Sequence, residues 1–81
     1  MKILTALNEG QDKLKKNDIK SSMLDSEILI SEALKKDRKF VILNPAKEIE
    51  ESEYFNFKNL INERSKGKPM AQIIGKKSFW K

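Results

Sequence analysis

The sequence predicts an all-α fold, a small bundle of four to five helices. Leu, Ile, Lys and Glu dominate a chain of 81 residues that holds only three Gly and two Pro, which is typical of a helical domain. No segment alternates apolar and polar residues as a strand would, whereas apolar residues recur at helical spacing. A chain of this length forms one domain at most.

Two helices are expected in the first half of the chain. Residues 3–16 place four residues on one helical face: Ile3, Leu7, Gly10 and Leu14. Gly in mid-helix costs up to ~1 kcal/mol relative to Ala, so Gly10 indicates a close helix crossing. The second helix runs from Ser22, which has capping-box spacing with Asp25, to about residue 34. Its apolar residues cover more than half of its circumference, which predicts the central helix of the bundle: Met23, Leu24, Ile28, Leu29, Ile30, Ala33 and Leu34.

A short helix and a longer one follow. Asp37 can cap a helix over residues 38–43, and Pro45 prevents its extension because the residue before a proline avoids helical angles. A fourth helix over residues 51–65 begins among acidic side chains, which favour the positive end of the helix dipole. Gly67 suits the position just after the end of that helix.

The last expected element is a short helix over residues 69–74, which completes a helical domain of residues 1–75. Residues 76–81 are expected to form a loosely held, extended C-terminal tail. Phe79 and Trp80 stand beside the last residue without a partner segment, so the chain looks like part of a larger protein cut at a linker.

The residue inventory argues against several kinds of site. The chain has no His and no Cys, which removes disulfides, thiolate metal sites and the commonest general base. Asp25 and Glu27 diverge on a helix and are expected to cap it and face solvent. The acidic run in residues 48–53 is expected to be a helix N-terminus, with a metal site as the alternative. We therefore predict no catalytic, cofactor-binding or metal-binding residue in this chain.

The remaining inferences concern compartment and partners. No apolar stretch is long enough for a membrane span or a secretory signal, so a cytoplasmic protein is expected. The net charge of +5 fits either lysines at helix C-termini or a surface that meets an acidic partner. Candidate partner-binding residues are Arg38 and Lys39, at the start of the third helix, and Phe55 on the fourth. Phe55 points away from the apolar stripe of its helix, so it is either a contact site or a stray surface residue.

Several blocks of the sequence match a known pattern: Asp25-x-Glu27-x-Leu29-Ile30, Lys36-Asp37-Arg38 leading to Phe40, Leu60-Ile61-x-x-Arg64-x-x-Gly67-x-Pro69-x-Ala71-x-Ile73-x-Gly75, and Phe79-Trp80. In these blocks the chain resembles the N-terminal domain of the peptide chain release factor N(5)-glutamine methyltransferases, the HemK/PrmC type. Glu50 stands where that family usually has a Ser or Thr cap, so we expect the start of the fourth helix to fray.

The resemblance implies a parent protein with two parts. The helical domain would recognise the release factor, and a β-hairpin beginning in residues 76–81 would lead to a Rossmann-like methyltransferase domain. That domain would transfer a methyl group from S-adenosylmethionine to the Gln of the release factor's Gly-Gly-Gln motif. The family's cofactor loop and catalytic Asn-Pro-Pro-Tyr belong to it; here Asn44-Pro45 continues with Ala46-Lys47. The 81 residues alone are therefore expected to be inactive and to bind no cofactor.

The expected partners are the release factor and the parent's own methyltransferase domain, without a membrane or direct nucleic-acid contact. Two other functions stay open: a stand-alone basic helical module that binds RNA or the ribosome, and a structural helical adaptor. Steep salt dependence of RNA binding would favour the first of these.

Overall fold

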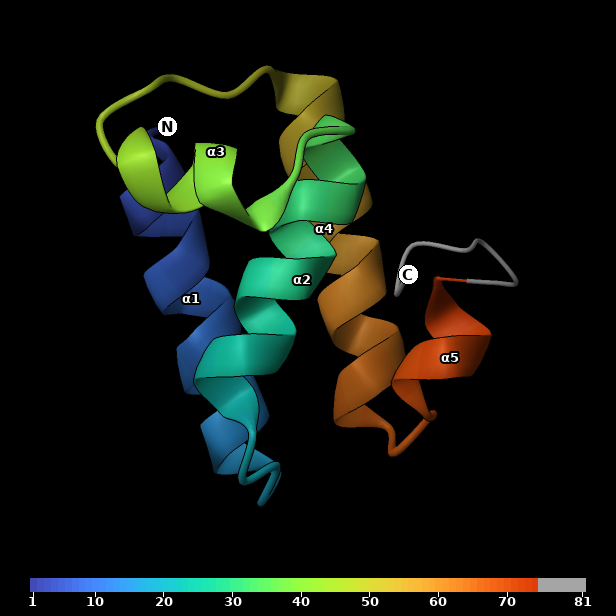
Figure 1. The fold of residues 1–81 in the computed structure, drawn as a ribbon. Coiled ribbons are helices and arrows are strands. Elements are labelled where there is room, and N and C mark those ends of the chain that lie inside the picture. The colour runs from blue at the N-terminus through green and yellow to red at the C-terminus, as the bar shows by residue number, and fades with distance from the viewer. Residues whose placement is uncertain (75–81) are drawn as a thin grey trace.

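The computed structural model describes residues 1–74, which form five helices (Figure 1). The bounds are α1 Ile3–Lys16, α2 Ser22–Leu34, α3 Arg38–Leu43, α4 Glu51–Ser65 and α5 Met70–Ile73. Within these residues no strand forms, and the expected all-α fold is confirmed. The expected tail over residues 76–81 and the domain boundary at residue 75 lie outside the described residues and stay predictions.

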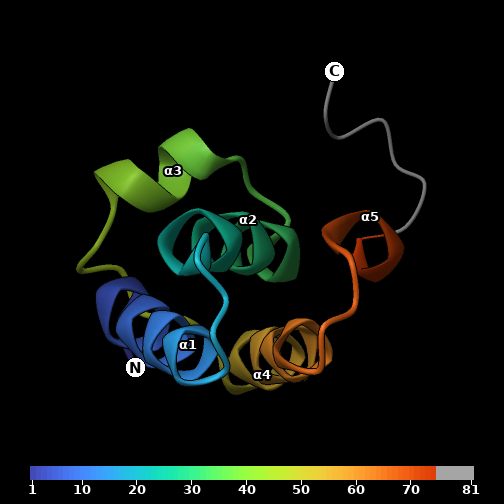
Figure 2. The same cartoon turned by 90° about the horizontal axis from the view of Figure 1, so that it is seen from below.

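The second helix is central, as its apolar residues predict. α2 contacts α1, α3 and α4, and Figure 2 shows α3 on one side of α2 with α1 and α4 on the other. Leu29 and Ile30 in its middle are fully buried. α5 packs against α4, on the side away from α1 (Figure 2).

The first turn of α2 differs from the expectation. Met23 and Leu24 are exposed, whereas Ser22 and Ser26 are buried. Small seryl side chains thus occupy the packed side of this turn, and the larger apolar side chains face solvent. The apolar circumference of α2 is therefore narrower than its composition indicates.

Asp25 is a second difference. The expected capping box with Ser22 does not form: the N-cap is Ser21, which makes no side-chain bond to the backbone, and its Oγ donates to Asp25 Oδ2 at 2.8 Å. The same oxygen accepts from Arg64 Nε at 2.9 Å, and Asp25 is only 4% exposed. The expectation of a solvent-facing Asp25 is wrong, because Asp25 lies in the bundle, where a carboxylate needs a charged partner.

α1 and α4 cross closely at Gly10, as the sequence predicts. A Cβ atom built on Gly10 would lie 2.6 Å from Phe57 Cζ and 2.9 Å from Ile61 Cδ1. Both of these side chains belong to the buried core. The Phe57 ring therefore takes the space that a side chain at position 10 would need.

Carboxylates begin two of the helices. The N–H of Phe40 donates to Asp37 Oδ1 at 2.8 Å, so the expected cap of α3 is confirmed. The N–H of Glu50 donates to Glu53 Oε1 at 2.8 Å, the reciprocal bond of a capping box. The expected fraying at Glu50 is therefore wrong, because the acidic first turn of α4 itself supplies the cap.

The turn between α4 and α5 is a Schellman motif. Gly67 has φ of +95°, and its N–H donates to the carbonyl of Arg64 at 2.9 Å. The N–H of Lys68 donates to the carbonyl of Glu63 at 3.4 Å. Arg64 Nη1 donates in turn to the carbonyl of Lys68 at 2.9 Å. Arg64 therefore links the buried carboxylate of α2 to the turn that leads into α5.

Backbone hydrogen bonds tie the start of the chain to the connection between α3 and α4. The N–H groups of Ile3 and Leu4 donate to the carbonyls of Lys47 and Pro45, at 2.9 and 3.0 Å. These bonds satisfy two N–H groups that the first turn of α1 leaves without helical partners. They also bring the first residues of α1 beside the residues that follow α3.

Candidate partner-binding surface

The three partner-binding residues predicted from the sequence do not form one site. Arg38 and Lys39 lie at the start of α3, and Phe55 lies on α4, where it is 64% exposed. Figure 2 shows α2 between these two helices. They are therefore candidates for two separate surfaces.

The two basic residues of α3 differ in their surroundings. Arg38 Nη2 donates to Glu27 Oε1 at 2.9 Å, an ion pair in which the side chain of Glu27 is mostly covered. Lys39 is exposed and forms no ion pair with another described residue. Arg38 thus has a structural partner on α2, and Lys39 is the more available cation.

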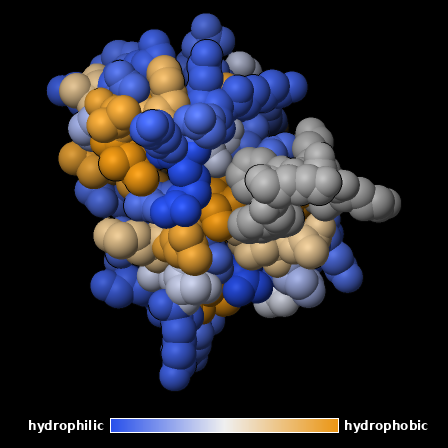
Figure 3. Space-filling view, in the orientation of Figure 1, coloured by the Kyte–Doolittle hydropathy of each residue, from blue (hydrophilic) through white to orange (hydrophobic). Residues whose placement is uncertain are grey.

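A group of exposed apolar side chains lies where α1 begins and α3 ends, and we call it the α1/α3 patch. Its members, with their exposed fractions, are Met1 42%, Leu4 49%, Ile42 54% and Leu43 67%. Figure 3 shows hydrophobic atoms gathered over the region of α3 and the start of α1. The hydrogen bond from the Leu4 N–H to the Pro45 carbonyl, 3.0 Å long, holds these two segments together.

Two exposed lysines lie beside the α1/α3 patch. Lys39 lies three and four residues before Ile42 and Leu43 on α3, the spacing of neighbours on a helix surface. Lys47 is exposed and its backbone pairs with the start of α1. The nearby carboxylate of Glu48 accepts a 2.8 Å hydrogen bond from the N-terminal ammonium, which lowers the pKa of Glu48.

The α1/α3 patch is not among the surfaces predicted from the sequence. A signal was present: four apolar residues stand in succession at positions 40–43, and a helix of six residues cannot turn all of them toward one neighbour. Only Val41 is buried among them.

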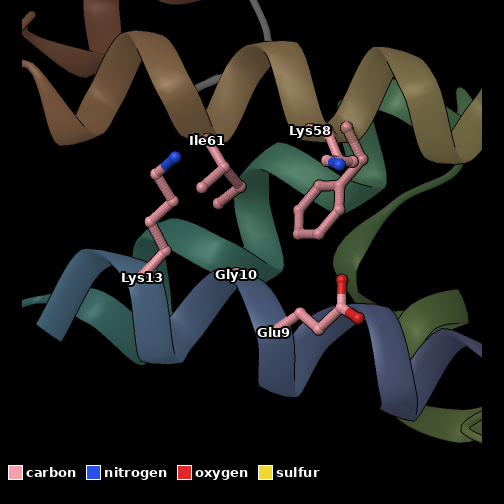
Figure 4. Close-up of a pocket in the computed structure, with 6 residues that line it drawn as sticks. Glu9, Gly10, Lys13, Lys58 and Ile61 are labelled. Carbon is pink, nitrogen blue, oxygen red and sulfur yellow. The ribbon is translucent and has the colours of Figure 1, made fainter. Parts of the chain in front are cut away.

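A small cavity lies between α1 and α4 beside Gly10 (Figure 4). Its volume is about 60 Å³, and its walls are Glu9, Gly10, Lys13, Phe57, Lys58 and Ile61. At the rim, the Tyr54 hydroxyl donates to Glu9 Oε1 at 2.6 Å, and this hydrogen bond raises the pKa of Tyr54. Sites for small molecules usually measure about 300–1,000 Å³, so this cavity is a packing space next to the glycine.

The described part of the chain lacks two other kinds of site. Residues 1–74 hold no group of three or more acidic side chains placed to bind a metal ion. No helix within them has the length and apolarity that a membrane crossing needs.

The comparisons with known proteins agree with one another. Residues 5–75 match the family model described as the PrmC N-terminal domain. The chain is 38% identical over 78 residues to a release factor glutamine methyltransferase of Leptospira interrogans, which covers 96% of this chain and 27% of that protein. It is 42% identical over 79 residues to a protein of the same name from Clostridium acetobutylicum, with 98% of this chain and 28% of that protein covered.

A third relative has a different name. It is a bifunctional methyltransferase of Rickettsia felis, 35% identical over 78 residues, which cover 96% of this chain and 15% of that protein. The chain thus spans about a quarter or less of the length of the curated relatives it matches. No solved structure matches the chain significantly.

Proposed function

The chain belongs to the PrmC N-terminal domain family, and from this membership we propose that it recognises the substrate of a release factor glutamine methyltransferase. The observation that carries the proposal is the match of residues 5–75 to that family. Relatives that are named release factor glutamine methyltransferases also align with nearly the whole chain. The reaction would be transfer of a methyl group from S-adenosylmethionine to the Gly-Gly-Gln glutamine. The complete protein would carry it out in the cytoplasm.

Asn44-Pro45 continues with Ala46-Lys47, so the Asn-Pro-Pro-Tyr sequence expected of the family's catalytic domain is not in this chain. The cavity beside Gly10, with a volume of about 60 Å³, is too small for a ligand of the size of S-adenosylmethionine. We therefore assign cofactor binding and catalysis to a part of the protein outside this structure. The helical domain contributes binding surface.

A physical reason for a separate recognition domain lies in the size of the target. A Gly-Gly-Gln tip offers little surface, whereas a specific protein interface buries roughly 1,200–2,000 Å² in total. A helical domain that contacts the body of the release factor supplies the missing area. Its net charge of +5 suits an acidic protein surface and would increase the association rate.

RNA or ribosome binding is the second candidate, favoured by the same net charge. Proteins that bind single-stranded nucleic acid usually combine a basic groove with exposed aromatic rings for base stacking. The largely exposed hydrophobic side chains of residues 1–74 are mostly aliphatic or Met, with Phe55 the aromatic exception. The surface chemistry therefore favours a protein partner.

The test compares the full-length protein with a version that lacks residues 1–75. We expect the shortened enzyme to lose kcat/KM on intact release factor and to retain it on a short Gly-Gly-Gln peptide. Retention on the peptide shows that the catalytic part is folded and active. Equal kcat/KM of the two enzymes on intact release factor would refute the proposal, and RNA binding with a steep salt dependence would favour the second candidate.

A further inference from the structure

We propose that the α1/α3 patch, with Lys39 and Lys47 beside it, is the surface that docks the body of the release factor. The proposal rests on the proposed function and assigns its binding surface. The partner chemistry that fits is an apolar protrusion flanked by carboxylates on a folded protein.

The apolar side chains of the patch are exposed to solvent. Ile42 and Leu43 are 54% and 67% exposed on a helix of six residues. Val41 already anchors α3 to the core, so its two neighbours are not needed for that packing. An exposed apolar patch with a polar rim marks an interaction site more often than a scattered apolar residue does.

Positive charge lies next to the patch. Lys39 and Lys47 are exposed cations beside it, and the carboxylate of Glu48 is held by the N-terminal ammonium at 2.8 Å. A partner with carboxylates around an apolar centre would be complementary in both respects. RNA would satisfy the lysines and leave the aliphatic side chains uncovered, because these offer no aromatic face for stacking.

The patch occupies the part of the bundle where α1 begins and α3 ends. The matched family model is an N-terminal domain, so the remaining length of the relatives follows α5. α5 packs on α4, and α3 lies on the far side of α2 from α4 (Figure 2). The patch thus faces away from the place where the methyltransferase part would continue, which leaves it open to a separate molecule.

The test uses the full-length protein with the double substitution Ile42→Ser/Leu43→Ser. The matched control is Met23→Ser, which removes an apolar side chain of similar exposure, 56% against 54% for Ile42, from α2. Phe55→Ser tests the other candidate surface, on α4. We expect the double variant to raise KM for intact release factor about 10- to 30-fold, the effect of losing a hot spot. kcat, and kcat/KM on a Gly-Gly-Gln peptide, should stay unchanged, as should the helical circular dichroism.

A charge reversal at Lys39 tests the proposed charge complementarity between the patch and its partner. Lys39→Glu should slow association with intact release factor about tenfold at low salt, and the difference should shrink at high salt. The same substitution should leave the rate on the peptide unchanged. An unchanged association rate at low salt would contradict the assigned charge complementarity.

Other results overturn the assignment in distinguishable ways. A loss with Phe55→Ser and none with the double variant places the contact on α4. An equal loss on intact release factor and on the peptide means that the patch contacts the methyltransferase part. If the double variant changes only the self-association of the protein or only its retention of RNA, the patch binds a second copy of the chain or RNA and not the release factor. If deletion of residues 1–75 reduces activity on intact release factor and the double variant does not, the α1/α3 patch is not the docking surface, while the proposed function stands. If neither change reduces that activity, the docking surface and the proposed function are both refuted.

Discussion

Replacement of Arg64 by Met should destabilise the domain strongly, because it leaves the carboxylate of Asp25 buried without its cation. The side chain of Asp25 is 6% exposed and that of Arg64 20% exposed. Breaking a buried ion pair from one side costs about 3–5 kcal/mol. The partial exposure of Arg64 and the remaining hydrogen bond from Ser21 place the expected loss near the lower end, at about 3 kcal/mol.

This loss is large for so small a domain. A chain of 81 residues has a stability of roughly 4–12 kcal/mol at about 0.05–0.15 kcal/mol per residue. Urea unfolding followed by helical circular dichroism measures the difference directly. The control is Arg38→Met, which breaks a pair whose cation is 44% exposed and whose carboxylate is 15% exposed. Because water reaches this pair more easily than the Asp25–Arg64 pair, the loss should stay near about 1 kcal/mol.

A double-mutant cycle separates the ion pair from the packing of the arginine stem. With Asp25→Asn added to Arg64→Met, no charge is left buried, so the combined loss should fall short of the sum of the two single losses. Contacting charged residues usually couple by about 0.5–3 kcal/mol. An Arg64→Met variant as stable as Arg38→Met, or additive losses in the cycle, would refute the assignment of this pair as a buried, coupled one.

Three further predictions concern the core and the pH dependence. Leu29→Ala should cost about 2–5 kcal/mol because Leu29 is fully buried; a loss below about 0.5 kcal/mol in urea unfolding would contradict the central position of α2. Gly10→Ala should destabilise despite its better helix propensity, since overpacking costs about 1–3 kcal/mol against a gain of up to about 1 kcal/mol; a more stable variant would show that Phe57 moves freely. Tyr54, whose pKa is raised by its hydrogen bond to Glu9, should contribute stability below about pH 10 that is lost as the pH rises through its folded pKa. Ultraviolet titration of this single tyrosine should therefore shift toward the ordinary value in Glu9→Ala, which removes the acceptor, and an unchanged curve would exclude that hydrogen bond.

The helices could be predicted because their signals are local. Asp37 and Gly67 mark the start of α3 and the end of α4 by their own backbone chemistry, and Gly10 identified the crossing because only a close approach explains glycine inside a helix. The Asp25–Arg64 pair joins residues 39 positions apart. Nothing in the sequence near either residue identifies the other as its partner, because the two meet only when α2 packs against α4. The spacing of Ser22 and Asp25 instead predicted a helix cap.

The candidate surface was harder to predict for a related reason. Helical spacing identifies an apolar face and does not identify which faces a neighbour will cover. Met23, Leu24, Ile42 and Leu43 look like core residues in the sequence and are exposed in the fold. Arg38, Lys39 and Phe55 are all exposed, and Arg38 also has an ion-pair partner within the domain; their contact with a partner stays a prediction.

The way the first residues are bound has a practical consequence for protein production. The N–H of Ile49 donates to the carbonyl of Met1 at 2.9 Å, and the ammonium of Met1 contacts Glu48. An affinity tag fused ahead of Met1 would turn this ammonium into an amide and add foreign chain beside Leu4 and Ile42. Binding measurements on N-terminally tagged protein would then report a partly obstructed surface with an unpaired Glu48. Tag removal that restores a free Met1, or purification without such a fusion, keeps the contact between the Met1 ammonium and Glu48.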